Sequence, residues 1–343
     1  MRSVSLRHLL ALASQPAKVA AEECHREVAS RLDCQAQLTR ALSSCKMSSP
    51  QEEGPRRTLR MLVEGVGREM GSLGPLLESN VERYHRELEL IEMRYSTFIE
   101  TVVEATVHAS NRTVLNALEG LVESHVGAAL LLRHQLKAHH LNKKSAVEEH
   151  VDLKKMVLDC TADASTLAFL DADDLFELEG FDTNPTVAGV PHHAAHALLE
   201  ILKNALQSHL ESNVKDKPVR VRWSPSESRL TVEDFGKGLE GGSKAFKELA
   251  RLRPGKRYDR IDQQTSYAAV SNPLGGIQVG LFVAKVHANH FKLPQHQEED
   301  YLLLDSPGPS GLGAIAHLIL PNSLNASETL RDLEPLTDAL NRL

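Results

Sequence analysis

The stretch from Pro191 to Glu211, PHHAAHALLEILKNALQSHLE, constrains this chain most, because it predicts one amphipathic helix with a chemically specialised polar row. Apolar residues recur at helical spacing along one face: Ala195, Leu198, Leu199, Leu202, Ala205 and Leu206. His196, Glu200 and Asn204 stack in a row on another face, with Lys203 beside it. An imidazole, a carboxylate and an amide in one row suit the holding of a hydrated Mg²⁺ and the steering of a proton. A merely solvated polar face explains the same pattern, so the helix alone leaves both interpretations open.

Two predicted strands and a glycine pair follow this helix. Val219–Trp223 and Arg229–Asp234 are rich in β-branched residues and are joined by the polar sequence SPSES, which predicts a hairpin. The second strand ends in DFGKG, with Gly236 and Gly238 just beyond Asp234. Such glycines let the backbone approach a ligand closely, and the carboxylate can accept a hydrogen bond from an exocyclic amine. Glycine and aspartate are also ordinary turn residues, so this motif by itself is weakly specific.

Two more glycine-rich segments lie downstream. Gly275, Gly276 and Gly280 open an apolar helical run, PLGGIQVGLFVAK, and the free N–H groups of a helix start can bind phosphate. Ser310–Pro321, SGLGAIAHLILP, predicts a glycine-rich turn that enters a buried strand.

The order of these motifs resembles the Bergerat ATP-binding fold. E-x-x-K-N-A, D-x-G-x-G, a glycine-rich helix start and G-x-G before a strand follow one another as they do in a class of heat-shock chaperones, gyrase, histidine kinases and the mitochondrial dehydrogenase kinases. Within that group the chain is most similar to the pyruvate and branched-chain 2-oxoacid dehydrogenase kinases. Three segments carry this similarity, Leu118–His140, Val151–Leu170 and Val190–Glu211, and the resemblance extends over roughly residues 80–321.

The predicted fold class is α plus α/β: an N-terminal four-helix bundle at residues 31–145, then a Bergerat-type α/β sandwich at residues 146–343. Apolar residues follow the helical period from about Thr58 to His140, after a polar loop at Ser48–Arg57. His125 and His134 lie in or beside the apolar stripe and are expected to pack there rather than to bind metal. Beyond Leu141–His150, helical patterns alternate with β-rich runs.

Residues 1–30 carry a separate signal. MRSVSLRHLLALASQPAKVA has basic and serine residues, no acid before Glu22, and Leu6, Leu9, Leu10 and Ala13 on one helical face. Such a segment resembles a mitochondrial transit peptide, and an ordinary N-terminal helix is the alternative.

Composition excludes little but agrees with this fold. The 343 residues are 41% hydrophobic and 25% charged, which is ordinary for a soluble protein of two domains. A net charge of −7 gives no sign of nucleic-acid binding, and no apolar run suggests a membrane span. The four cysteines lack C-x-x-C pairing and are expected to be free thiols.

The resemblance supplies residue roles, with ATP and Mg²⁺ as the cofactors. It makes Asn204 the Mg²⁺ ligand, Glu200 the general base for the acceptor serine, and His196 a neighbour that tunes Glu200. Asp234 matches the residue that recognises the adenine amine. The nucleotide-binding set it implies is Asn204, Lys203, Asp234, Gly236, Gly238, Gly275, Gly276, Gly280, Leu281 and Gly313. Ser243–Arg260 occupies the position of the ATP lid, and Asp173 and Asp174 are expected to form a solvated acidic turn.

The chain also departs from the family pattern. Gln278 stands where the family usually has the middle glycine of its second box, Phe282 where it has proline, and Ala314 where it has threonine. Loss of one neutral hydroxyl contact costs on the order of 1 kcal/mol. The family's C-terminal Asp-Trp pair has no counterpart, because Trp223 is the only tryptophan.

Two functions are therefore expected. The first is a serine protein kinase of the mitochondrial matrix that phosphorylates and inactivates the E1 component of a 2-oxoacid dehydrogenase complex. Partners to consider are then E1, the lipoyl domain of E2 and a second copy of the chain. The second is a catalytically weak relative that serves as a nucleotide-binding regulatory or structural subunit. The sequence does not choose between pyruvate and branched-chain complexes.

Overall fold

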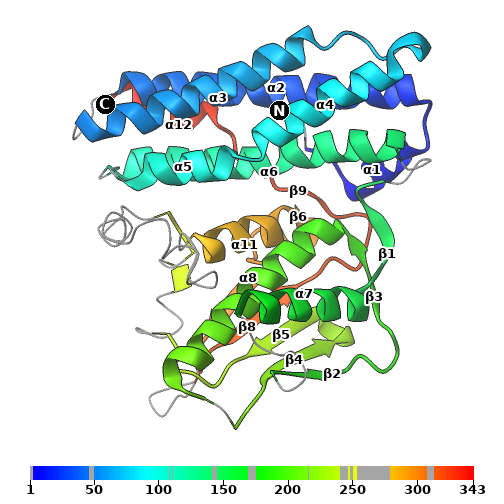
Figure 1. Cartoon of the computed structure of the whole chain (residues 1–343), viewed down its shortest axis with the longest axis vertical. Coiled ribbons are helices and arrows are strands. Elements are labelled where there is room, and N and C mark those ends of the chain that lie inside the picture. Colours follow the sequence, from blue (N-terminus) through cyan, green and yellow to red (C-terminus); the bar gives the residue numbers. More distant parts are fainter. Residues whose placement is uncertain are drawn as a thin grey trace. The chain divides into compact units, whose positions relative to one another are not determined.

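A computed structural model describes residues 3–45, 50–107, 109, 111–140, 145–168, 175–214, 216–239, 246–247, 250–252, 279–306 and 313–343. The chain divides into two compact units (Figure 1). The helical unit comprises Met1–Val147, Leu252–Tyr258 and Ser327–Leu343, and the sheet unit comprises Glu148–Arg251 and Asp259–Ala326. The break after Val147 lies close to the expected boundary at residues 145–146. Ser327–Leu343, which we expected in the nucleotide domain, belongs instead to the helical unit.

The helical unit is built from long helices that pack along one another. They are α1 (Leu6–Ala13), α2 (Ala17–Ser44), α3 (Glu53–Ser72), α4 (Val81–Tyr95), α5 (Phe98–Val107), α6 (Arg112–His140) and α12 (Glu334–Asn341), with short 3₁₀ turns at Pro50–Glu52 and Glu78–Asn80. α2 packs on α3 and α6, while α4 and α5 in turn contact both α3 and α6. The loop expected at Ser48–Arg57 is wrong from Glu53 onward, because Pro55 lies in the first turn of α3, where a helix tolerates proline.

Aromatic rings fill the centre of this unit. His125 is buried and stacks on Phe98 with ring centroids 4.5 Å apart, and its ring lies 4.3 Å from that of Tyr95. Burial lowers the pKa of His125 to about 3. His134 is also buried, and its Nδ1 accepts from the backbone N–H of Ala146 at 3.3 Å. Both histidines therefore pack in the core, as predicted.

The first residues of the chain form part of the same core. Ser5 caps α1 by accepting from the N–H of His8 at 3.1 Å, and Leu6, Leu9 and Leu12 are buried. The expected apolar face was slightly rotated, since Leu10 is only half-buried. In addition, the N–H of Val4 donates to Glu328 Oε2 at 3.0 Å. Residues of the segment that resembles a transit peptide thus pack inside the unit, and its removal stays a prediction.

A buried ion pair ties α2 to the C-terminal segment within this unit. The guanidinium of Arg31 donates to both carboxylate oxygens of Glu328, at 2.8 and 2.6 Å, and both side chains have no exposed surface. Such a bidentate pair has the geometry that charged groups need when they leave water.

By length and composition, the part of α6 from Arg112 to Lys137 could cross a membrane, although we expected no membrane span from the sequence. Within the structure, 89% of its most apolar stretch is buried. The four cysteines are free thiols, as predicted.

The sheet unit contains a mixed five-stranded sheet covered by helices. Its strands are β2 (Phe176–Glu179), β4 (Val219–Ser224), β5 (Arg229–Glu233), β8 (Ile315–Ile319) and β7 (Leu302–Asp305), in that spatial order. β2 and β4 are parallel, and the other pairs are antiparallel. β1 (Glu148–Asp152) and β3 (Thr186–Gly189) form a separate antiparallel pair, and short strands lie at Phe291–Lys292 (β6) and, in the helical unit, Ser327–Glu328 (β9). The predicted hairpin is confirmed as β4 and β5, joined by a 3₁₀ turn at Pro225–Glu227.

In the described part of this unit, three helices accompany the sheet: α7 (Leu153–Ala168), α8 (Pro191–Ser212) and α11 (Gly280–Asn289), with a 3₁₀ turn at Pro294–His296. α7 and α8 lie along the same side of the sheet (Figure 1). The predicted apolar stripe of α8 is shifted: Ala197 and Ile201 are buried, whereas Ala195 and Leu199 are only half-buried. The core joins Leu198 and Leu202 of α8 to the inner side chains of β4, β5 and β8, namely Val219, Val221, Leu230, Val232, Ala316 and Leu318.

Candidate functional site

A pocket opens within the sheet unit between α8 and the sheet. It holds about 570 Å³ of empty space including its open mouth. Its wall is mostly apolar with a few polar groups, and is made of Ile201, Asn204, Ala205, Ser208, Val232, Asp234, Gly238, Leu239, Leu281, Leu304, Ala314 and Ala316. The structure thus brings together four residues that the sequence assigned to a nucleotide: Asn204, Asp234, Gly238 and Leu281.

Asp234 is the most constrained polar group of this pocket. Its side chain is 8% exposed, and its Oδ1 accepts from the N–H of Gly236 at 2.9 Å and from the hydroxyl of Ser208 at 3.0 Å. Oδ2 accepts from the N–H of Ala314 at 3.2 Å. Burial is the main cause that raises the pKa of Asp234, and these donors oppose it. The carboxylate is therefore held in one orientation, with acceptor capacity left on Oδ2 for a ligand donor.

Glycines surround Asp234 because no side chain fits there. A β-carbon on Gly236 would lie 2.6 Å from the carbonyl oxygen of Ser208, and one on Gly238 would lie 2.6 Å from that of Gly313. Gly238 and Gly313 also have positive φ, +73° and +95°, which L side chains rarely adopt. Gly236 thus lets the chain after β5 approach Ser208 of α8. Gly238 and Gly313 let the same chain approach the segment before β8, next to the Asp234 carboxylate.

Glu200 lies on α8 beside the first residue of α11. Its Oε1 accepts from Nζ of Lys203 at 2.7 Å, and both side chains are largely buried, at 16% and 14% exposure. A β-carbon on Gly280 would overlap the Glu200 carboxylate. Lys203 thus pairs with Glu200, the residue expected to act as general base. Neither Glu200 nor Lys203 lines the pocket.

Asn204 lines the pocket one helical turn beyond Glu200. Its Nδ2 donates to the backbone oxygen of Glu200 at 2.5 Å. This hydrogen bond uses the amide nitrogen, so the amide oxygen is the atom suited to a cation. In the described part of the chain, no three His, Cys, Asp or Glu side chains form a group that could hold a metal ion. A single amide oxygen still fits Mg²⁺, which commonly keeps several waters and takes its other ligands from phosphates.

His196 lies in a group of histidines rather than alone beside Glu200. Its ring centroid is 4.5 Å from that of His287 on α11. The expected hydrogen bond between His196 and Glu200 stays a prediction.

Several predicted residues lie outside the described residues: Gly275, Gly276, Gln278, Asp173 and Asp174, and most of the lid segment Ser243–Arg260.

Sequence reasoning missed Ser208 and the histidines of α11. Ser208 continues the row His196, Glu200, Asn204 by one more step of four, so the signal was present. The gathering of His287 with the α8 histidines depends on how two helices pack, which no spacing within one helix shows.

No protein-family model matches this chain, and no curated protein matches it.

Proposed function

We propose that the pocket at Asp234 binds Mg·ATP and that the sheet unit is a divergent Bergerat-type domain. The observation that carries this is the Asp234 carboxylate, fixed by three donors in a pocket whose backbone passes close by at Gly238 and Gly313. A buried carboxylate with a spare acceptor position suits the exocyclic amine of adenine. The apolar wall formed by Ile201, Val232 and Ala316 suits the faces of its ring.

Asn204 lies on the same wall and would hold the Mg²⁺ that accompanies the phosphates. Mg²⁺ supplies charge neutralisation between the phosphate oxygens. Gly280 begins α11 beside Glu200. Nζ of Lys203 pairs with Glu200 and would also attract a phosphate that binds at this place.

The activity we propose is phosphoryl transfer to a serine of the E1 component of a 2-oxoacid dehydrogenase complex, in the mitochondrial matrix. Glu200 would accept the proton of the serine hydroxyl while the serine oxygen bonds to the γ-phosphorus and ADP leaves. Little covalent chemistry is asked of the protein, so positioning by α8 is its main contribution.

The test is transfer of labelled γ-phosphate to purified E1 by wild type, Glu200→Gln and Gln207→Ala. Gln207 is a matched control on α8, because its Nε2 donates to Glu211 and it lies outside the pocket wall. Loss of a general base lowers turnover by about 10²–10⁴-fold. We expect that loss in Glu200→Gln and none in Gln207→Ala. Equal transfer by wild type and Glu200→Gln would remove Glu200 from the mechanism.

The second candidate is a nucleotide-binding subunit with weak catalysis. It is favoured by the ion pair that occupies Glu200 Oε1 and by Ala314 at a pocket position where the related kinases carry a hydroxyl. Binding of Mg·ATP by wild type without transfer to either a pyruvate or a branched-chain E1 would support this candidate against the kinase.

A further inference from the structure

Five imidazoles gather where α8 packs on α11. His192, His193 and His196 come from the first turns of α8, and His287 and His290 from the end of α11. His287 lies at the centre, with its ring centroid 4.5 Å from that of His196, 4.7 Å from that of His193 and 6.0 Å from that of His192. His290 joins through His193, at 5.1 Å.

Among the residues that the structure describes, His287 has no partner that would compensate a positive charge. It is 8% exposed, and its Nδ1 has no hydrogen-bond partner among them. The nearby charges on α11 are already paired, since Lys285 binds Asp300 at 2.9 Å. The groups that bear electrostatically on His287 are the four other histidines, and these, after burial itself, hold its pKa well below the ordinary value.

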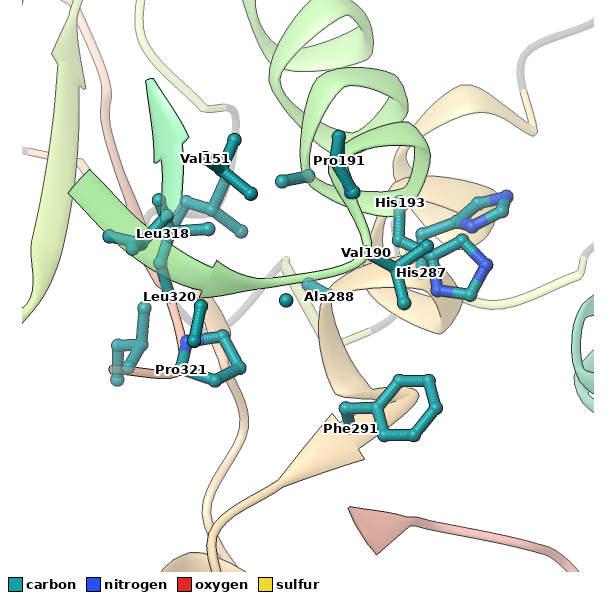
Figure 2. A pocket seen from close by; sticks show the side chains of 15 residues that line it. Val151, Val190, Pro191, His193, His287, Ala288, Phe291, Leu318, Leu320 and Pro321 are labelled. Carbon is teal, nitrogen blue, oxygen red and sulfur yellow. The ribbon is translucent and has the colours of Figure 1, made fainter. Parts of the chain in front are cut away.

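Apolar side chains lie directly beside the cluster. His193 and His287 stand together at one end of a separate pocket, whose wall includes Val190, Phe291 and Leu318 (Figure 2). Separation of α8 from α11 would therefore bring apolar surface into contact with water.

We propose that this five-histidine cluster is a proton-operated switch that loosens the packing of α11 on α8 when the solution becomes acidic. Neutral imidazoles carry no net charge, so their rings can pack against one another at the centroid distances given above. A second proton in the cluster would place two cations close together, where His193 and His287 are buried from water.

The direction of the effect follows from proton linkage. An unfolded histidine titrates near about pH 6.5, whereas folded His287 takes up its proton only at lower pH. Well above about pH 6.5 His287 is neutral in both states and contributes no pH dependence. Below it the open state binds more protons, so the closed packing loses stability as the pH falls.

The switch reaches the pocket described above through the same two helices. α8 carries Glu200 and Asn204, and α11 begins at Gly280 against Glu200. Opening would weaken the binding of a ligand in that pocket, and this consequence rests on the proposed function. The opening itself does not depend on that function.

The test is hydrogen–deuterium exchange of α8 and α11 at pH 7.5 and 5.5 with EDTA present, corrected for intrinsic rates, together with binding of an apolar dye. Each pKa unit of depression is worth up to about tenfold in the closed-to-open ratio. We expect exchange in wild type to rise about tenfold on acidification, with more dye bound, and His287→Leu to show less than about a twofold rise. The matched control is His150→Leu, at an exposed position of β1, which should behave as wild type.

His192→Gln keeps the test decisive if His287→Leu does not fold, because residue 192 is exposed and tolerates substitution. It should reduce the acid-induced rise without abolishing it. Equal rises in wild type and in the variants that fold would overturn the switch. Nucleotide titration runs in parallel: acid opening without any nucleotide binding at pH 7.5 would refute the proposed function and leave the switch standing.

Discussion

The carboxylate of Glu200 and the first residue of α11, Gly280, are in such close contact that a methyl group on Gly280 would overlap the carboxylate. This contact makes the expected base part of the packing between α8 and α11. Glu200 is thereby held by Lys203 on one side and approached by α11 on the other.

Gly280→Ala should displace Glu200 or shift the start of α11. Because the contacting atoms belong to the far end of the flexible Glu200 side chain, we expect this side chain to move, with little change in the free energy of unfolding and a fall in phosphate transfer. Gly189→Ala is the control, because a β-carbon at Gly189 meets nothing within 4 Å. A transfer assay of both variants decides the matter, and equal transfer by the two would show that this contact does not position Glu200.

Asp234→Asn should harm both stability and ligand binding. The three hydrogen bonds described above for Asp234 all come from donors, so an amide NH₂ would face either Ala314 N–H or the donors from Gly236 and Ser208. Burying an unmatched donor costs about 1–3 kcal/mol. Asp305→Asn provides the control at a side chain that is 60% exposed. A melting temperature unchanged in Asp234→Asn would mean that the carboxylate is not fixed in this way.

Lys203→Met should free Glu200 from its ion pair while keeping the length of the aliphatic chain. If the pair restrains the base, turnover rises or stays equal; if Lys203 contacts phosphate, affinity for Mg·ATP falls by about tenfold or more, as for a charged hydrogen bond. Calorimetry combined with a transfer assay separates the two. Unchanged affinity together with lowered turnover would contradict both interpretations.

Deletion of residues 1–16 should destabilise the helical unit. It removes α1 with the buried Leu6, Leu9 and Leu12, and takes the Val4 N–H away from Glu328. Loss of three buried leucines corresponds to several kcal/mol, at about 1.5–3 kcal/mol each. Guanidinium unfolding of full-length and shortened chains measures this. An unchanged midpoint would instead fit a dispensable leader.

Arg31→Met tests the buried ion pair between Arg31 and Glu328, the residue that also accepts from the N–H of Val4. It leaves a carboxylate without its main partner, which costs about 3–5 kcal/mol. Arg83→Met is a suitable control, since Arg83 forms an exposed pair on α4 with Glu87. Similar unfolding curves for these two variants would contradict a structural role for the Arg31–Glu328 pair.

The sequence predicted local structure well where one pattern dominates. The hairpin of β4 and β5 follows from β-branched runs around SPSES, and α8 follows from its apolar period. The buried face of α8, which includes Ala197 and Ile201, was not predicted exactly. α8 packs against α11 and β5 as well as α7, and a single apolar stripe does not describe several neighbours. Glu328 could not be predicted as the partner of Arg31, since 297 residues separate them and only tertiary packing joins them.

The sequence motifs predicted part of the pocket wall. Asp234, Gly238, Asn204 and Leu281 share one pocket, as the resemblance implied. The pairing of Glu200 with Lys203 and the approach of Gly280 arise from side-chain choice and helix packing, which the motif E-x-x-K-N-A does not contain.

Calorimetric titration of Mg·ATP into wild type and Asn204→Ala, with Gln207→Ala as the control, tests the central claim most directly. Asn204 lines the pocket and is the residue whose amide oxygen we propose as the metal ligand, whereas Gln207 pairs with Glu211. We expect wild type and Gln207→Ala to bind Mg·ATP alike, and Asn204→Ala to bind it about 10–100-fold more weakly, as for the loss of a metal contact. An absence of binding to folded wild type, or equal binding by all three proteins, would contradict a nucleotide site at Asp234 and Asn204.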